Sequence, residues 1–107
     1  MIVEKVLLAK EIKALANLLE AKYQHKFSFK NHCYLRIAYD NTVHEKWINK
    51  VNKPFINNAS VDMLLLAKNL LHKYTIDIDA LKIDNEKSLV YRKTKSKKNE
   101  LKKNLLF

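Results

Sequence analysis

The segment NHCYLRIAYDNTVHEKW, residues 31–47, concentrates the residue types that most often carry chemistry. It contains two of the four histidines, one of the two arginines, and the only cysteine and tryptophan of the 107-residue chain. If the segment is helical, four of its polar residues recur every fourth position and form a row that drifts by about 40° per step. The row and its neighbours form a candidate ligand or partner groove: His32, Arg36, Asp40, Asn41, His44 and Trp47.

This row has three alternative interpretations. The first is structural: the polar groups of the row hydrogen-bond to each other or to neighbouring helices, as Arg36 and Asp40 can do four residues apart, and Trp47 anchors the core. The second is a groove that holds an anion or stacks a base. The third is catalysis or metal binding, because Asp40 and His44 can supply two ligands from one helix. A zinc site needs at least a third ligand, and no HExxH or CxxC pattern is present. The sequence therefore assigns no catalytic residue, metal site or cofactor.

Glycine is absent from the chain, and this excludes several classes of function. The phosphate-binding P-loop, the dinucleotide-binding fingerprint and the nucleophile elbow all need glycine for tight turns or close backbone approach. Tight two-residue β-hairpins also favour residues with positive φ. An enzyme is consequently the least favoured class, and a helical fold is favoured over a sheet.

The net charge of +10 is concentrated near the C-terminus. Residues 92–103, RKTKSKKNELKK, carry seven cations and one acid and so contribute +6 of that charge. Such a cluster predicts contacts with nucleic-acid phosphates. The candidate nucleic-acid-binding residues are Tyr91, Arg92, Lys93, Lys95, Lys97, Lys98, Lys102 and Lys103. The mixture of 19 lysines, 11 asparagines and two arginines is also what the codon usage of an AT-rich genome produces.

Hydrophobic periodicity predicts an all-α, single-domain bundle of about four helices. The expected helices cover residues 3–23, 29–49, about 60–74, and about 78 into the basic tail, with Ser28, Ser60 and Asp77 among the candidate N-caps. We expect a bundle domain at 1–91 and a basic tail or helix extension at 92–107. The expected core is Leu8, Ile12, Leu15, Leu19, Ile37, Trp47, Ile48, Leu64, Ala67, Leu71, Leu81 and Leu89, with Phe55 and Ile56 as a plug after Pro54.

These features predict a small basic protein that associates with RNA or DNA through its tail. The alternative is a non-enzymatic helical module that binds a protein partner or regulates one. No apolar run approaches the roughly 18 residues that span a bilayer. The N-terminal residues also lack the pattern of a signal peptide. We therefore expect a cytoplasmic protein without a membrane partner, and the lone Cys33 fits that compartment.

Overall fold

The computed structural model describes the backbone of residues 2–105 and the side chains of residues 3–93. The elements in chain order are α1 (Ile2–Lys22), α2 (Asn31–Val43), the 3-10 helix η1 (Trp47–Asn49), α3 (Phe55–Asn58), α4 (Val61–Ile76) and α5 (Ile78–Leu105). The described residues contain no strand, and four of the helices are substantial. The predicted all-α bundle is therefore confirmed, with the short α3 added in the irregular stretch around Pro54.

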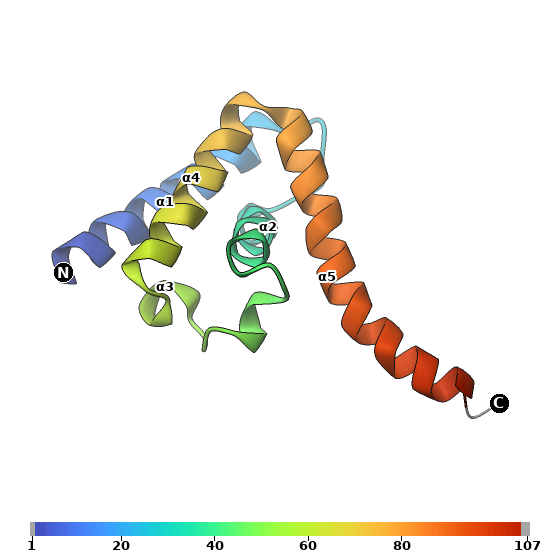
Figure 1. Ribbon diagram of the computed structural model, residues 1–107. Coiled ribbons are helices and arrows are strands. Elements are labelled where there is room, and N and C mark those ends of the chain that lie inside the picture. The colour runs from blue at the N-terminus through green and yellow to red at the C-terminus, as the bar shows by residue number, and fades with distance from the viewer. Residues whose placement is uncertain (1, 106–107) are drawn as a thin grey trace.

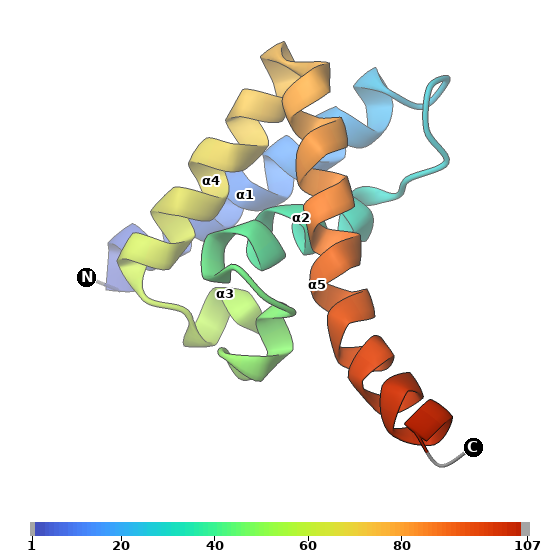
Figure 2. The same ribbon diagram turned by 45° about the vertical axis from the view of Figure 1, so that its right-hand side comes forward.

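Helix α2 lies at the centre of the bundle (Figures 1 and 2). It packs against α1, α4 and α5, and α1 packs along α4. Helix α5 crosses the other side of α2, and its last turns project beyond the body. Its backbone passes the predicted domain boundary at 91/92 and continues to Leu105. The central element of the fold is thus the same segment that concentrates the chemically active residue types.

The inward faces of α1 and α4 are those that the periodicity predicts. The residues that are predicted and found in the core are Leu8, Ile12 and Leu19 on α1 and Leu64, Ala67 and Leu71 on α4, and Tyr23 and Tyr74 are buried beside them. Other apolar residues of these helices, Leu7, Leu18 and Leu66, are about half exposed. So small a bundle covers each of these helices on one side only, and leaves apolar residues outside.

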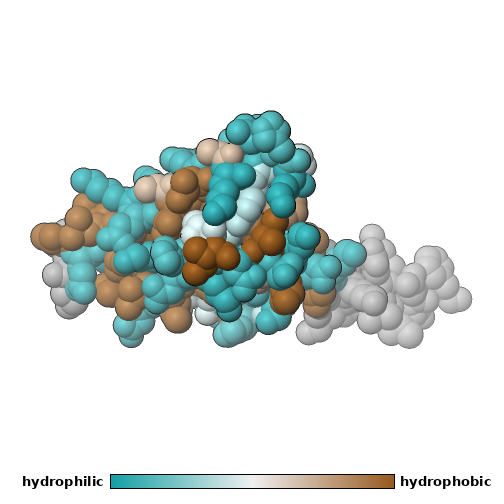
Figure 3. Space-filling view, turned by 90° about the horizontal axis from the view of Figure 1, so that it is seen from above, coloured by the Kyte–Doolittle hydropathy of each residue, from teal (hydrophilic) through white to brown (hydrophobic). Residues whose placement is uncertain are grey.

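Apolar residues consequently interrupt the hydrophilic surface of the described part of the chain. Figure 3 shows hydrophobic residues among hydrophilic ones on the upper face, including the end of the molecule where α1 begins. Within the described residues, no helix combines the length and apolar content that a bilayer crossing requires.

Two of the predicted N-caps are found. Ser60, the N-cap of α4, accepts a hydrogen bond from the backbone N–H of Met63 at 3.1 Å. Asp77, which precedes α5, accepts one from the backbone N–H of Ala80 at 3.0 Å. The prediction that Ser28 caps α2 is wrong. The first backbone N–H of α2 instead donates to the carboxylate of Glu20 on α1 at 2.7 Å. A tertiary contact here replaces the local cap.

The predicted helix over residues 29–49 is wrong at its end, because α2 stops at Val43. His44 adopts the left-handed conformation, with φ of 61°, and its N–H bonds back to the carbonyl of Asp40. A left-handed residue after the last helical turn is a common helix terminator, although glycine usually supplies it. The chain then turns into η1, and Ile48, expected in the core, is 38% exposed. Leu89 on α5 was also predicted in the core and is 43% exposed.

Aromatic rings from α2, η1 and α3 pack against one another. Tyr39 and Phe55 stack with ring centroids 3.8 Å apart, and Trp47 meets both rings edge-on. Phe55 is 2% exposed, which confirms the predicted plug. Trp47 is only half-buried, so the predicted core anchor covers this cluster from its edge.

Candidate functional site

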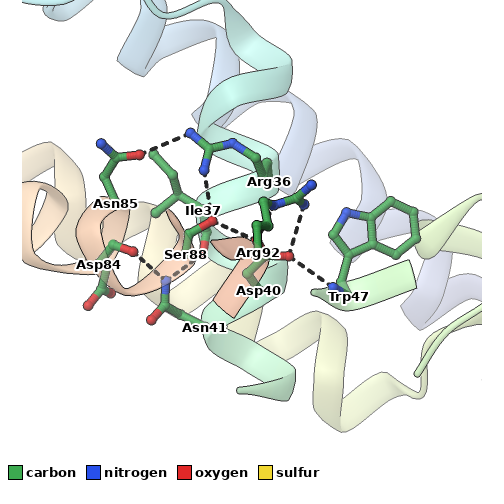
Figure 4. A network of polar contacts seen from close by, with 9 residues as sticks. All are labelled: Arg36, Ile37, Asp40, Asn41, Trp47, Asp84, Asn85, Ser88 and Arg92. Atoms are coloured by element: carbon green, nitrogen blue, oxygen red, sulfur yellow. Dashed lines mark hydrogen bonds and ion pairs between the residues drawn. The ribbon is translucent and has the colours of Figure 1, made fainter. Parts of the chain in front are cut away.

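Asp40 is a fully buried carboxylate on the last turn of α2. Arg92 of α5 donates to both of its oxygens, from Nε to Oδ2 at 2.7 Å and from Nη2 to Oδ1 at 3.1 Å. Ser88 Oγ donates to Oδ2 at 2.6 Å, and the backbone N–H of Trp47 donates to Oδ1 at 2.9 Å (Figure 4). A buried charge is tolerated when it is paired and hydrogen-bonded in this way.

Arg36 lies one turn before Asp40 on α2 and contacts the same part of α5 (Figure 4). Its Nη1 donates to Ser88 Oγ at 2.8 Å and its Nη2 to Asn85 Oδ1 at 2.9 Å. Burial lowers the pKa of Arg36, and the positive charge of Arg92 lowers it in the same direction. The Ser88 hydroxyl therefore bridges Arg36 and Asp40, since it accepts a hydrogen bond from the first and donates one to the second. Arg36 and Asp40 thus hydrogen-bond to the neighbouring helix α5 and not to each other, which is one of the two arrangements that the structural interpretation allows.

Asn41 completes the contact between the two helices. Its side-chain amide donates to the carbonyl of Ile37 at 2.8 Å and to the carbonyl of Asp84 on α5 at 2.9 Å. The Asp84 carboxylate in turn accepts from the hydroxyl of Tyr74 on α4 at 2.6 Å. Burial and this hydrogen bond raise the pKa of Tyr74. We call the network of Arg36, Asp40, Asn41, Asp84, Asn85, Ser88 and Arg92 the α2–α5 clamp.

The two histidines of the predicted row lie outside the α2–α5 clamp. His32 and His44 are both exposed, and among the described residues His44 meets the network only through its backbone N–H, which donates to the carbonyl of Asp40. The drift of the row carries His32 away from Asp40, and His44 follows the end of the helix. Trp47 contributes its backbone N–H, while its indole packs on Tyr39. The row therefore divides into an inward-facing middle and exposed ends.

The α2–α5 clamp also contains residues that the sequence did not assign to a site. Asp84, Asn85 and Ser88 come from α5, where Leu81, Asn85, Ser88 and Arg92 follow one another at three- and four-residue spacing and so form one row. That row does face inward, since Leu81 and Ser88 are fully buried. The sequence pattern that could have identified them is the polar residues Asn85, Ser88 and Arg92 in the same row as the apolar Leu81. Their partners are the polar row of α2.

The predicted nucleic-acid-binding residues fall into two groups. Arg92 is held by Asp40 and its side chain is 29% exposed, Tyr91 is half-buried, and Lys93 is exposed. The other lysines belong to the helical backbone of α5, but their side chains lie outside the described residues: Lys95, Lys97, Lys98, Lys102 and Lys103. Phosphate binding by this segment remains a prediction.

This arrangement has a structural role, which is to hold α5 in position on α2. Both oxygens of Asp40 are engaged by protein donors, so the carboxylate has little freedom to act as a base or a ligand. Among the described side chains, no three His, Cys, Asp or Glu residues gather as metal ligands would. Five charged or amide side chains instead fix the register of α5 on α2, together with the hydroxyl of Ser88: Arg36, Asp40, Asn41, Asn85 and Arg92.

Comparisons with known proteins give this chain no relatives: no family model, curated protein or solved structure matches it.

Proposed function

We propose that the protein associates with nucleic acid through the basic second half of α5. The observation that carries the proposal is that this helix continues past the body to Leu105 (Figures 1 and 2), and that residues 92–103 carry +6 of the chain's +10 charge. A basic helix that projects from a folded body can approach a phosphate backbone without steric hindrance from the bundle. Lysine contacts of this kind supply sequence-independent affinity that salt weakens.

The α2–α5 clamp supports this proposal by fixing the base of the projecting helix. Arg92 is the first cation of the basic segment, and its two hydrogen bonds go to Asp40. We therefore assign it to anchoring and assign phosphate contact to the six lysines of residues 93–103. Arg36 and Asp40, whose polar atoms are engaged within the bundle, receive no role in reading bases. Binding that depends on lysine alone favours little sequence preference, since lysine acts as a point charge.

The test is a fluorescence-anisotropy titration of labelled single-stranded RNA and duplex DNA over a series of salt concentrations. The tail variant replaces Lys95, Lys97, Lys98, Lys102 and Lys103 with Gln. The matched control removes the same charge from five exposed body lysines: Lys26, Lys30, Lys73, Lys82 and Lys87. Full-length protein is used throughout, and Arg92 is retained so that the clamp is intact.

We expect the affinity of the unmodified protein for single strands to fall with a log–log salt slope of up to about −4 if all six lysines meet phosphates. The tail variant reduces the magnitude of that slope by about 3.5, whereas the control variant leaves most of it. Equal losses in the two variants would contradict the proposal, since the net charge and not the projecting helix would then govern binding. Absence of binding at low salt would also contradict it.

A second candidate function, docking of a protein partner, is favoured by a separate observation. Residues of α1 and α3 line a largely apolar hollow. These two helices lie on the other side of α2 from α5 (Figures 1 and 2).

A further inference from the structure

Residues of α1 and the short α3 line an open hollow of about 470 Å³. Its apolar walls are Val6, Ala9 and Ile56, and three lysines border it: Lys5, Lys10 and Lys13. A volume of this size accommodates several side chains of a ligand. The hollow is thus large enough for a partner's apolar anchors.

A second hollow of about 330 Å³ lies beside the first, because Ile56 lines both. The second hollow runs toward Trp47, with Leu35 and Pro54 in its walls and Lys53 at its border. We call the two adjacent hollows together the α1–α3 groove.

The charges around the α1–α3 groove have one sign. Four lysines line it, and none of its lining residues is an acid. The acids in the first half of α1 lie on another side of the helix. Glu11 pairs with Lys68 of α4 at 2.6 Å, and Glu4, seven residues before Glu11, lies on the same side as Glu11. The lysines at the groove are therefore free to meet negative charges from outside.

We propose that the α1–α3 groove docks an amphipathic helix of a protein partner, with an apolar stripe flanked by Asp and Glu. Helices that bind in apolar grooves place anchors at three- and four-residue spacing, and complementary charges at the rim fix their orientation. Here the anchors enter the two hollows beside Ile56 and the acids meet the lysines. The proposal concerns a different surface from the basic half of α5 and does not depend on nucleic-acid binding.

The walls of the groove favour such a helix over the alternatives. Single-stranded nucleic acid binds by stacking bases on open aromatic faces. Of the three aromatic residues that line the second hollow, Tyr39 and Phe55 are stacked on each other and are 5% and 2% exposed, so only the half-buried Trp47 could offer a face to a base. A second copy of this chain would bring a net charge of +10 to a lysine-rimmed surface and be repelled.

The test uses the full-length protein and a fluorescein-labelled synthetic peptide of about 18 residues, long enough to form a helix. The peptide has leucines along one face and glutamates beside them; a second peptide replaces the glutamates with lysines. Two charge variants are compared: Lys10→Glu with Lys13→Glu at the groove, and Lys26→Glu with Lys87→Glu outside it. All four lysines are exposed, and both pairs change the net charge equally. Anisotropy gives the affinity.

We expect the acidic peptide to bind, the groove pair to weaken binding by about 10-fold or more, and the control pair to weaken it by less than about 3-fold. The lysine-flanked peptide should bind at least about 10-fold more weakly than the acidic one. A second comparison tests the apolar wall. Val6→Asp abolishes binding, while Val3→Asp, at a 71% exposed position of α1 outside the groove, leaves it unchanged. The emission of Trp47, the only tryptophan, shifts to the blue when peptide covers the second hollow.

Equal losses in the groove and control pairs, or equal binding of the two peptides, would overturn the proposal. The salt-dependent titration of nucleic acid on the same variants separates the two proposals. Loss of peptide binding with unchanged nucleic-acid binding is the expected result for the groove pair. Loss of both in equal measure would show a general effect of charge and would overturn the assignment to the groove.

Discussion

Replacement of Arg92 by Met tests whether the α2–α5 clamp holds the base of α5. Met keeps most of the aliphatic stem but removes the charge and both hydrogen bonds to Asp40. The carboxylate then remains fully buried, with only Ser88 and the N–H of Trp47 as donors. The folded state loses a charge-assisted pair, while the unfolded state is hardly affected.

The expected loss of stability follows from the burial of the two partners. Removal of one member of a buried ion pair costs about 3–5 kcal/mol, because the other charge is left uncompensated. Arg92 is 29% exposed and Asp40 keeps two donors, so we expect the lower end, about 3 kcal/mol. A small domain has a total stability of about 5–15 kcal/mol, so this loss is a substantial fraction.

Urea denaturation followed by circular dichroism and by Trp47 fluorescence measures the change. The matched control is Lys93→Met, the same change of charge at the next, exposed position, which should stay within about 0.5 kcal/mol of the unmodified protein. Asp40→Asn completes a double-mutant cycle with Arg92→Met, in which we expect a coupling energy of about 1–2 kcal/mol. An Arg92→Met protein as stable as the control, together with a coupling near zero, would refute the reasoning.

Three further predictions concern capping and the buried tyrosines. Ser60→Ala should cost about 1 kcal/mol in urea unfolding because it removes the N-cap of α4, while Ser28→Ala should change stability by less than about 0.5 kcal/mol. Tyr74→Phe should destabilise by about 1–2 kcal/mol because it leaves Asp84 without a donor, whereas Tyr34→Phe should be neutral or stabilising. The hydroxyl of Tyr34 is buried and has no hydrogen-bond partner among the described residues. Burial raises the pKa of Tyr39 from 10.0 to about 12, so the folded state holds the phenol proton more tightly than the unfolded state does. The stability that this proton contributes is complete below pH 10 and is lost as the pH rises toward 12. Unfolding at a series of alkaline pH values, with tyrosinate absorbance of the folded protein, checks this, and ordinary titration near pH 10 would contradict it.

The sequence predicted α4 most accurately because several local signals agree there. A serine cap, an acid in the first turn and a three- and four-residue apolar period all mark one helix, and its predicted face is fully buried. The end of α2 could not be predicted in this way. It depends on the left-handed conformation of His44 and on the hydrogen bond from the backbone N–H of Trp47 to Asp40. No glycine or proline, the usual sequence signs of a helix end, lies at this point of the chain.

The candidate site was predicted in part for a related reason. Spacing alone placed Arg36, Asp40 and Asn41 together, and all three lie in the α2–α5 clamp. Their partners on α5 are more than forty residues away in the chain, and only the tertiary register of the two helices selects them. Periodicity predicts the inward face of each helix but not the register in which two packed helices contact each other.

The most direct test of the proposed function is a titration of the ¹⁵N-labelled full-length protein with a short single-stranded oligonucleotide, followed by amide chemical shifts. We predict that the shifts concentrate in residues 93–105 and that the indole N–H of Trp47 stays unchanged. Shifts that concentrate instead at the lysines of the α1–α3 groove, or an absence of shifts at low salt, would contradict the assignment of nucleic-acid binding to α5.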